Sequence, residues 1–181
     1  MSESRRPGVH ANEQAFTLLV STGRGLERQC ISALREIVAG FDPGLRAATS
    51  GFSGLLKGYS TKSSRDIVRH IIRMLEERPW YNELIKRVVP IDTVVPTDPG
   101  KIVEAVKELS LRASPATEES FRVRIRRRGA KLDRGELIAA IANLFCNRVD
   151  LGRPDFEVRI EVLGKFSGVS IIRRGEIFPD L

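Results

Sequence analysis

Helical and strand patterns follow one another in a fixed order over residues 15–92, and that order limits the folds open to the chain. Apolar residues recur every three to four positions in residues 24–39 and 63–78, as in helices with one buried face. Strand-length apolar runs precede, separate and follow these helices, and Ser50 and Gly51 indicate a hairpin between the middle two runs. The order βαββαβ predicts a ferredoxin-like domain over residues 13–92.

Residues 93–181 predict a second domain that also mixes helices and strands, in the order αβαββ. The proline- and glycine-containing stretch 92–100 is expected to be the joint between the two domains. Asp98 and Asp133 stand where N-caps of the two helices are needed. The chain is therefore expected to be an α+β protein of two domains. Residues 1–12, which are polar and lack periodicity, are expected to form a disordered tail.

The stretch SFRVRIRRRGAKLDRGEL, residues 120–137, combines a strand pattern with a dense cluster of cations. Its first part alternates apolar and basic residues, with Phe121, Val123 and Ile125 against Arg122, Arg124 and Arg126. Since alternate residues of a strand share a face, the apolar set should enter the core and the arginines should face solvent. Residues 122–134 hold seven basic residues and one acid, Asp133. Such clustering is typical of a surface that binds a polyanion.

A solvated strand face is the alternative interpretation of this stretch, with the arginines neutralised by carboxylates on a neighbouring strand. Neighbouring like charges destabilise a sheet unless something offsets them, and the stretch itself supplies a single acid. Arginine also has a planar fork of donors that suits bidentate contact with phosphate oxygens. We therefore expect the stretch to contact RNA or DNA.

Several spaced segments of the sequence resemble the THUMP domain, an RNA-binding module of tRNA-modifying proteins. The resemblance rests on FRVRIRRRG, the helix LDRGELIAAIA, the stretch VDLGRPDFEVRIEV and the closing strand GVSII. It covers roughly residues 85–175. The βαββαβ unit before it resembles the N-terminal ferredoxin-like domain that accompanies THUMP in this family.

The resemblance implies that the protein binds the acceptor end of tRNA, including its single-stranded 3′ terminus. It implies contacts between the RNA backbone and Arg122, Arg124, Arg126, Arg127, Arg128 and Lys131. Further basic residues are expected to extend this surface, namely Lys165, Arg173 and Arg174 near the final hairpin, and Lys86 and Arg87 toward the first domain. Pro154 and Asp155 match the family's turn and are expected to shape the edge of the sheet.

The expected role is that of a non-catalytic adaptor. THUMP proteins usually carry an enzyme after this module, whereas this sequence ends at GEIFPDL, close to the end of the THUMP pattern. It contains no P-loop, no SGG-type pyrophosphate loop and no zinc-deaminase motif. Gly23 and Gly25 lack the third glycine of a dinucleotide-binding motif and indicate a tight turn between strand and helix. We expect no catalytic residue, metal or cofactor.

This arrangement resembles the adaptor of the tRNA cytidine N4-acetyltransferase, which implies that the protein positions tRNA while a partner enzyme acetylates a cytidine of the D arm. Two alternatives stay open. The chain is either the RNA-binding subunit of a split tRNA thiolation (4-thiouridine) or methylation enzyme, or a module whose arginines bind an acidic protein. Trp80 and Tyr81 could stack on a base, but aromatic residues at a helix end more often close a core.

The location expected from the sequence is the cytoplasm. No apolar run approaches the roughly 18 residues that a membrane-spanning helix needs. Neither a membrane nor DNA is expected as a partner. Cys30 and Cys146 lie in helical patterns beside apolar residues, so both are expected to be buried and reduced.

Overall fold

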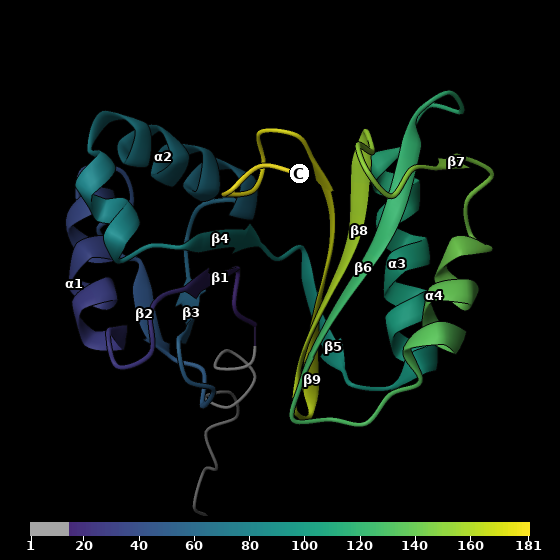
Figure 1. Cartoon of the computed structure of the whole chain (residues 1–181), viewed down its shortest axis with the longest axis horizontal. Coiled ribbons are helices and arrows are strands. Elements are labelled where there is room, and N and C mark those ends of the chain that lie inside the picture. Colours follow the sequence, from purple (N-terminus) through teal and green to yellow (C-terminus); the bar gives the residue numbers. More distant parts are fainter. Residues whose placement is uncertain (1–14) are drawn as a thin grey trace, which may run out of the picture.

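The computed structural model describes residues 15–181, which form two units with one sheet each (Figure 1). The expected disordered tail, residues 1–12, lies outside the described residues. The first unit contains β1 (Leu18–Ser21), α1 (Glu27–Val38), β2 (Arg46–Thr49), β3 (Leu55–Tyr59), α2 (Ser64–Glu77), the 3-10 helix η1 (Pro79–Glu83) and β4 (Arg87–Pro90).

The first unit has the ferredoxin-like order βαββαβ that the sequence predicts. Its strands pair antiparallel in the order β2-β3-β1-β4, and α1 and α2 cover one face of this sheet (Figure 1). The α2 helix begins where Ser63 accepts a hydrogen bond from the Asp66 N–H, and it ends just before Pro79. Apolar residues of the helices, such as Leu34 and Ile71, are fully buried against this sheet.

The second unit contains β5 (Thr93–Pro96), α3 (Pro99–Ala113), β6 (Ser120–Arg128), α4 (Arg134–Ala142), β7 (Arg148–Val149), β8 (Phe156–Leu163) and β9 (Phe166–Arg173). The strands lie in the order β5-β9-β8-β6-β7, and β6 runs parallel to both of its neighbours. Asp98 and Asp133 cap α3 and α4 as expected, since each carboxylate accepts the N–H three residues later. Both helices cover the same face of the sheet (Figure 1).

Some local expectations are wrong. The order αβαββ expected for the second unit lacks the short strand β7. The stretch 92–100 contains the edge strand β5, which pairs with β9, and is not only a joint. Its β-branched residues favour a strand, and Pro96 is tolerated because it ends a strand at the edge of the sheet. Cys146 is exposed, because α4 ends at Ala142 and leaves the cysteine in the loop that follows. Cys30 is buried as expected.

The uncovered faces of the two sheets pack against each other. Between them lies an apolar cluster in which Leu19 and Val89 of the first unit meet Leu163 and Ile172 of the second. The sheets approach closely at Gly168, where an added Cβ atom would lie 2.9 Å from the Ile91 side chain. This packing leaves no solvent layer on that part of the second sheet.

Polar contacts also join the units. The Arg65 guanidinium of α2 forms an ion pair with Asp92 at 2.7 Å and another with Glu176 at 3.2 Å. Beyond β9 the chain returns to the first sheet, where Phe178 and Val88 exchange two backbone hydrogen bonds of 2.8 and 3.0 Å. Over residues 15–181, none of the helices combines the length and apolar character needed to cross a membrane.

Candidate nucleic-acid interface

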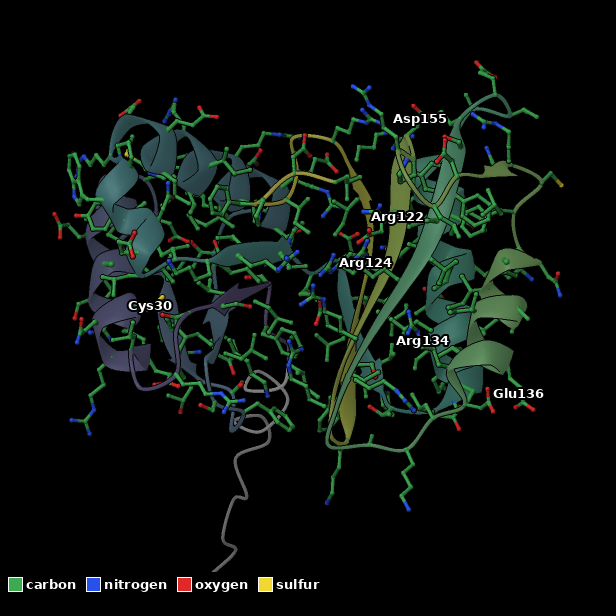
Figure 2. The ribbon with its side chains drawn as sticks, in the orientation of Figure 1. Cys30, Arg122, Arg124, Arg134, Glu136 and Asp155 are labelled. Atoms are coloured by element: carbon green, nitrogen blue, oxygen red, sulfur yellow. The ribbon has the colours of Figure 1, made fainter. Side chains whose placement is uncertain are left out.

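Strand β6 has two faces with different surroundings (Figure 2). Phe121 and Ile125 are buried in the core beneath α3 and α4, as the alternation predicts. Arg122 and Arg124 point the other way, toward the first unit (Figure 2). The arginines therefore share one face as expected, but that face is turned toward another part of the protein.

The expectation that Arg122 faces solvent is wrong. Its exposed fraction is 9%, and its Nε donates to Oε2 of Glu157 at 2.6 Å. Arg124 is only partly exposed, and its Nε donates to the same oxygen at 3.0 Å. The parallel register of β6 and β8 sets Arg122 beside Glu157, and the packing of the two sheets covers this part of the face. The carboxylate that neutralises these arginines thus comes from a neighbouring strand.

A second carboxylate of β8 continues this arrangement. Arg159 is 2% exposed and lies between two glutamates, with Nη1 donating to Glu157 at 2.6 Å and Nε donating to Glu161 at 2.8 Å. Glu161 also accepts from Nη1 of Arg128 at 3.0 Å. We name this set the charged layer; it comprises Arg122, Arg124, Arg126, Arg128, Glu157, Arg159 and Glu161.

The charged layer changes the protonation behaviour of its members. Burial raises the pKa of Glu157, but Arg159 and Arg122 outweigh burial, so the pKa lies below its ordinary value of 4.5. Glu157 is therefore an anion at neutral pH in spite of being buried. Burial lowers the pKa of Arg126, and the positive charge of Arg159 lowers it further. Within residues 15–181, no carboxylate forms an ion pair or a hydrogen bond with Arg126.

Three of the sequence-predicted cations meet at one end of the second sheet and are exposed. They are Arg127 at the end of β6, Lys131 in the loop to α4, and Lys165 in the turn between β8 and β9. The backbone joins these segments, because the Gly164 N–H donates to the Arg128 carbonyl at 2.8 Å. We name this set the basic end. All three side chains are exposed, and Nη1 of Arg127 also donates to the Leu132 carbonyl.

Arg173 and Arg174 lie at the opposite end of β9 and do not extend the basic end as expected. Arg173 stands opposite Phe156, at the start of β8, whereas the turn that carries Lys165 follows Leu163. The Arg173 guanidinium forms an ion pair with Glu119 at 3.0 Å. Arg174 donates to backbone carbonyls of Arg153 and Pro154. Both side chains thus stabilise the loops at their end of the sheet.

The residues expected near the first unit take separate positions. Lys86 precedes β4, is about half exposed and lies 3.6 Å from Glu83. Arg87 lies on β4 and lines a cleft together with Arg122 and Arg124. Asp155 has the structural role expected, since its carboxylate accepts the N–H and the hydroxyl of Ser120, both at 2.8 Å, and so ties the start of β8 to β6.

Of the two aromatic residues of η1, only Tyr81 is buried at the edge of the hydrophobic core. It is 7% exposed, whereas Trp80 is 64% exposed at the surface. The sequence interpretation of both as the edge of a core therefore holds for Tyr81 alone.

The residues that sequence reasoning missed are Glu157, Arg159 and Glu161. The sequence interpretation of FEVRIEVLG considered only its apolar residues. A signal was present, because the residues between the apolar positions of that stretch are an acid, a base and an acid. The stretch is also about as long as the arginine-rich strand. Pairing the two strands in parallel would have placed an acid beside Arg122.

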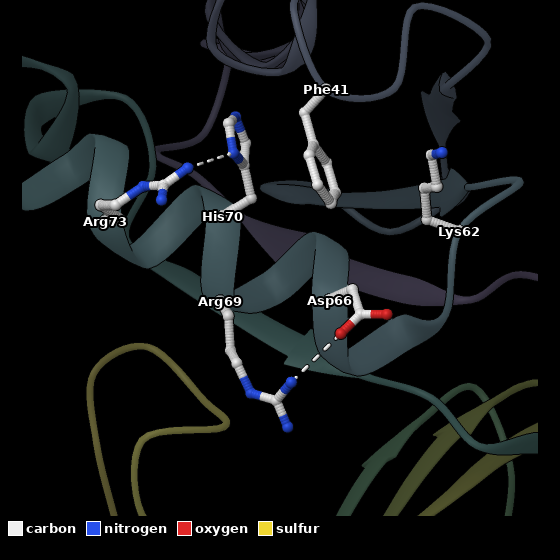
Figure 3. A pocket seen from close by; sticks show the side chains of 6 residues that line it. All are labelled: Phe41, Lys62, Asp66, Arg69, His70 and Arg73. Carbon is white, nitrogen blue, oxygen red and sulfur yellow. Dashed lines mark hydrogen bonds and ion pairs between the residues drawn. The ribbon is translucent and has the colours of Figure 1, made fainter.

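A cleft of about 570 Å³ lies on the first unit beside α2 (Figure 3). The His70 ring stacks on Phe41 with 4.5 Å between ring centroids. Its Nε2 donates to the Ile37 carbonyl at 3.0 Å, so Nδ1 is free to accept from Arg73 at 3.2 Å. The described part of the chain contains no group of three or more His, Cys, Asp or Glu side chains placed to hold a metal ion.

Solved structures share this fold at low sequence identity. PH1313 from Pyrococcus horikoshii has a TM-score of 0.62 and 18% identity, over 87% of this chain and 55% of that one. TrmN from Thermus thermophilus has a TM-score of 0.59 and 21% identity, over 86% and 45% of the two chains. A predicted N6-adenine-specific DNA methylase from Listeria monocytogenes has a TM-score of 0.56 and 15% identity, over 92% and 42%. The chain spans about half the length of these proteins.

No curated protein matches the chain in sequence. A family comparison matches residues 96–172, which include β6, α4, β8 and nearly all of β9, to the THUMP domain. This range contains the charged layer and the basic end. The chain therefore contains a THUMP domain, formed by residues 96–172.

Proposed function

We propose that this protein binds tRNA through its THUMP domain and holds the acceptor end for a separate modifying enzyme. The observation that carries RNA binding is the THUMP match itself, together with a basic end that is exposed within that domain. The formal net charge of +7 favours attraction to a polyanion.

The basic end is the part of the predicted surface best placed to contact phosphates. Arg127, Lys131 and Lys165 are exposed, whereas Arg122 is already paired and buried. Phosphate contacts fix the position of an RNA but carry little information on its base sequence. Selection of tRNA then rests on its overall shape and on its single-stranded 3′ end.

From the resemblance to the acetyltransferase adaptor, we further propose that the chain has no catalytic residue and acts in the cytoplasm. It would present tRNA to a cytidine acetyltransferase that modifies the D arm. The second candidate is an RNA-binding subunit of a split tRNA thiolation or methylation enzyme. It is supported by the fold that this chain shares with the structure named as a predicted DNA methylase.

Binding of tRNA should weaken as salt rises. If the three cations of the basic end meet phosphates of a single strand, the logarithm of the association constant should fall with the logarithm of salt concentration at a slope of about −2. Fluorescence anisotropy with a labelled tRNA transcript, from low to physiological salt, measures this slope. Duplex DNA and polyglutamate serve as controls. A flat response, or equal affinity for polyglutamate and tRNA, would refute the proposal.

The chemistry of the partner enzyme should be visible in cells that lack the protein. Mass spectrometry of nucleosides from purified tRNA is expected to show loss of N4-acetylcytidine, restored by the wild-type gene. Loss of 4-thiouridine or of a methylated nucleoside instead would favour the second candidate. An unchanged nucleoside profile would contradict both.

A further inference from the structure

A cleft of about 240 Å³ lies between the two units, where four arginines converge. Arg87 comes from β4 of the first unit, Arg122 and Arg124 come from β6, and Arg159 comes from β8. The segment that follows β9 completes the lining with Ile177, Pro179, Asp180 and Leu181. A site built from both sheets and from this segment depends on the packed arrangement of the two units.

The charges around the cleft do not balance. Arg122, Arg124 and Arg159 all share the carboxylate of Glu157. Glu161, the other carboxylate of the charged layer, is shared by Arg159 and Arg128. Asp180 adds one negative charge to the lining, and its Oδ1 accepts the N–H groups of Gly175 and Leu181, which leaves the cations in excess.

Two arginines beside these pairs have no acidic partner. The side chains of Arg87 and Arg126 form no ion pair or hydrogen bond with a residue in the part of the chain that the structure describes, and the carboxylate of Glu161 attracts both without contacting either. Burial lowers the pKa of Arg87, and the positive charges of Arg126 and Arg159 lower it further. Since a guanidinium does not lose its proton in a protein, this positive excess must be stabilised by an anion or by water.

An unsatisfied donor is present at the same place. Arg159 is 2% exposed, and its Nη2 has no hydrogen-bond partner among residues 15–181. Its other two nitrogens, Nη1 and Nε, are occupied by Glu157 and Glu161. Buried side-chain donors in proteins nearly always have a partner. Arg159 lines the arginine-rich cleft, so its unmatched nitrogen indicates that an acceptor is missing close to this cleft.

We infer that this cleft between the units binds a phosphate group, either as inorganic phosphate or as part of a nucleic-acid backbone. Arginine forks match phosphate oxygens in geometry as well as in charge. A phosphate in this cleft would lie among the guanidinium groups of Arg87, Arg124 and Arg159, and would so join the first sheet to the second. The inference does not depend on the proposed function, because a free anion satisfies the same donors.

The larger cleft beside α2 is a weaker candidate for the same ligand. There Arg69 is paired with Asp66 and is 56% exposed, and Arg73 donates to His70 (Figure 3). Its cations are partnered or solvated, whereas those between the units are crowded and partly buried.

The test compares the wild type with Arg87→Gln and with Arg112→Gln as a matched control. The substitution at Arg87 breaks no ion pair. Arg112 is 75% exposed on α3, away from the cleft. Melting temperatures are measured in phosphate and in chloride at equal ionic strength. We expect a saturable rise of about 2–4 °C with phosphate in the wild type and the control, and no such rise in Arg87→Gln.

A second measurement separates site binding from the general stabilising effect of phosphate on proteins. In ³¹P NMR titrations, inorganic phosphate should broaden with the wild type and with Arg112→Gln, and stay sharp with Arg87→Gln. In chloride, Arg87→Gln should melt no lower than the wild type, because it removes a crowded cation. An equal phosphate response in all three proteins would overturn the inference.

The source of the phosphate is decided with a tRNA transcript. If the RNA backbone occupies the cleft, Arg87→Gln should weaken tRNA binding about tenfold and inorganic phosphate should compete with tRNA. If tRNA affinity is unchanged while the phosphate response is lost, the site takes the free anion. A wild type that binds phosphate but no tRNA would overturn the proposed function and leave this site standing. Normal tRNA binding without any phosphate response would overturn the phosphate site and leave the proposed function standing.

Discussion

Replacing Glu157 with glutamine is expected to lower the free energy of unfolding by about 3–5 kcal/mol. Glu157 is fully buried and accepts from Arg122, Arg124 and Arg159. Glutamine keeps the shape of the side chain but removes the negative charge, so three guanidinium groups lose their shared counter-ion. No other residue of the described chain carries so many buried charge contacts.

Urea denaturation of the wild type and the variant measures this loss. The control is Glu104→Gln, because Glu104 is 61% exposed and forms an ion pair with Lys101 on the surface of α3. A pair of that kind contributes less than about 1 kcal/mol. If Glu157→Gln cost no more than the control, the charged layer would not stabilise the domain.

The same carboxylate predicts how stability depends on pH. Because the pKa of Glu157 is lowered in the folded protein, its contribution is fully present above the ordinary value of 4.5. The contribution is lost as pH falls from 4.5 through the lowered pKa, because over this range the unfolded state binds a proton that the folded state does not. The wild type should therefore lose stability more steeply below pH 4.5 than Glu157→Gln does.

Reversing two charges of the basic end should weaken tRNA binding about 100-fold. Lys131→Glu together with Lys165→Glu removes two phosphate contacts, each contributing a charge-assisted hydrogen bond of about 1.5 kcal/mol, and adds repulsion. Both side chains are exposed, so the fold should persist. Arg124 is unsuited to this test, because a glutamate there would stand beside Glu157 and destabilise the sheet.

The control for this variant carries the same change in net charge at another place. Lys107→Glu together with Arg112→Glu alters exposed residues toward the end of α3. Anisotropy titrations with tRNA at fixed salt should show nearly unchanged affinity for the control. Equal weakening in both double variants would mean that only net charge matters and that the basic end is no binding surface. Circular dichroism checks that each variant is folded.

Local patterns in the sequence predicted much of this fold. The caps at Ser63, Asp98 and Asp133 are set by residues within one helical turn, so they can be read without knowledge of the rest of the chain. The alternation in β6 likewise assigns Phe121 and Arg122 to opposite faces. Such signals depend only on the short period of helices and strands.

The surroundings of each face could not be predicted in this way. Alternation states which residues share a face, but the packing of another unit decides whether that face meets solvent. The partner of Arg122 lies 35 positions along the chain, in a strand brought alongside by parallel pairing. The strand β5 was missed for a related reason, because Pro96 and the glycine after it resemble a linker until β9 supplies a pairing partner.

The return of the chain to the first sheet has a mechanical consequence. The polypeptide passes between the sheets once before β5 and again after β9, where Phe178 pairs with Val88. Since two crossings and the Arg65 ion pairs resist relative rotation, the sheets should move as one rigid block. The distance between Lys86 and Lys165 is then fixed by the fold. An RNA that contacts both units would have to match this fixed distance.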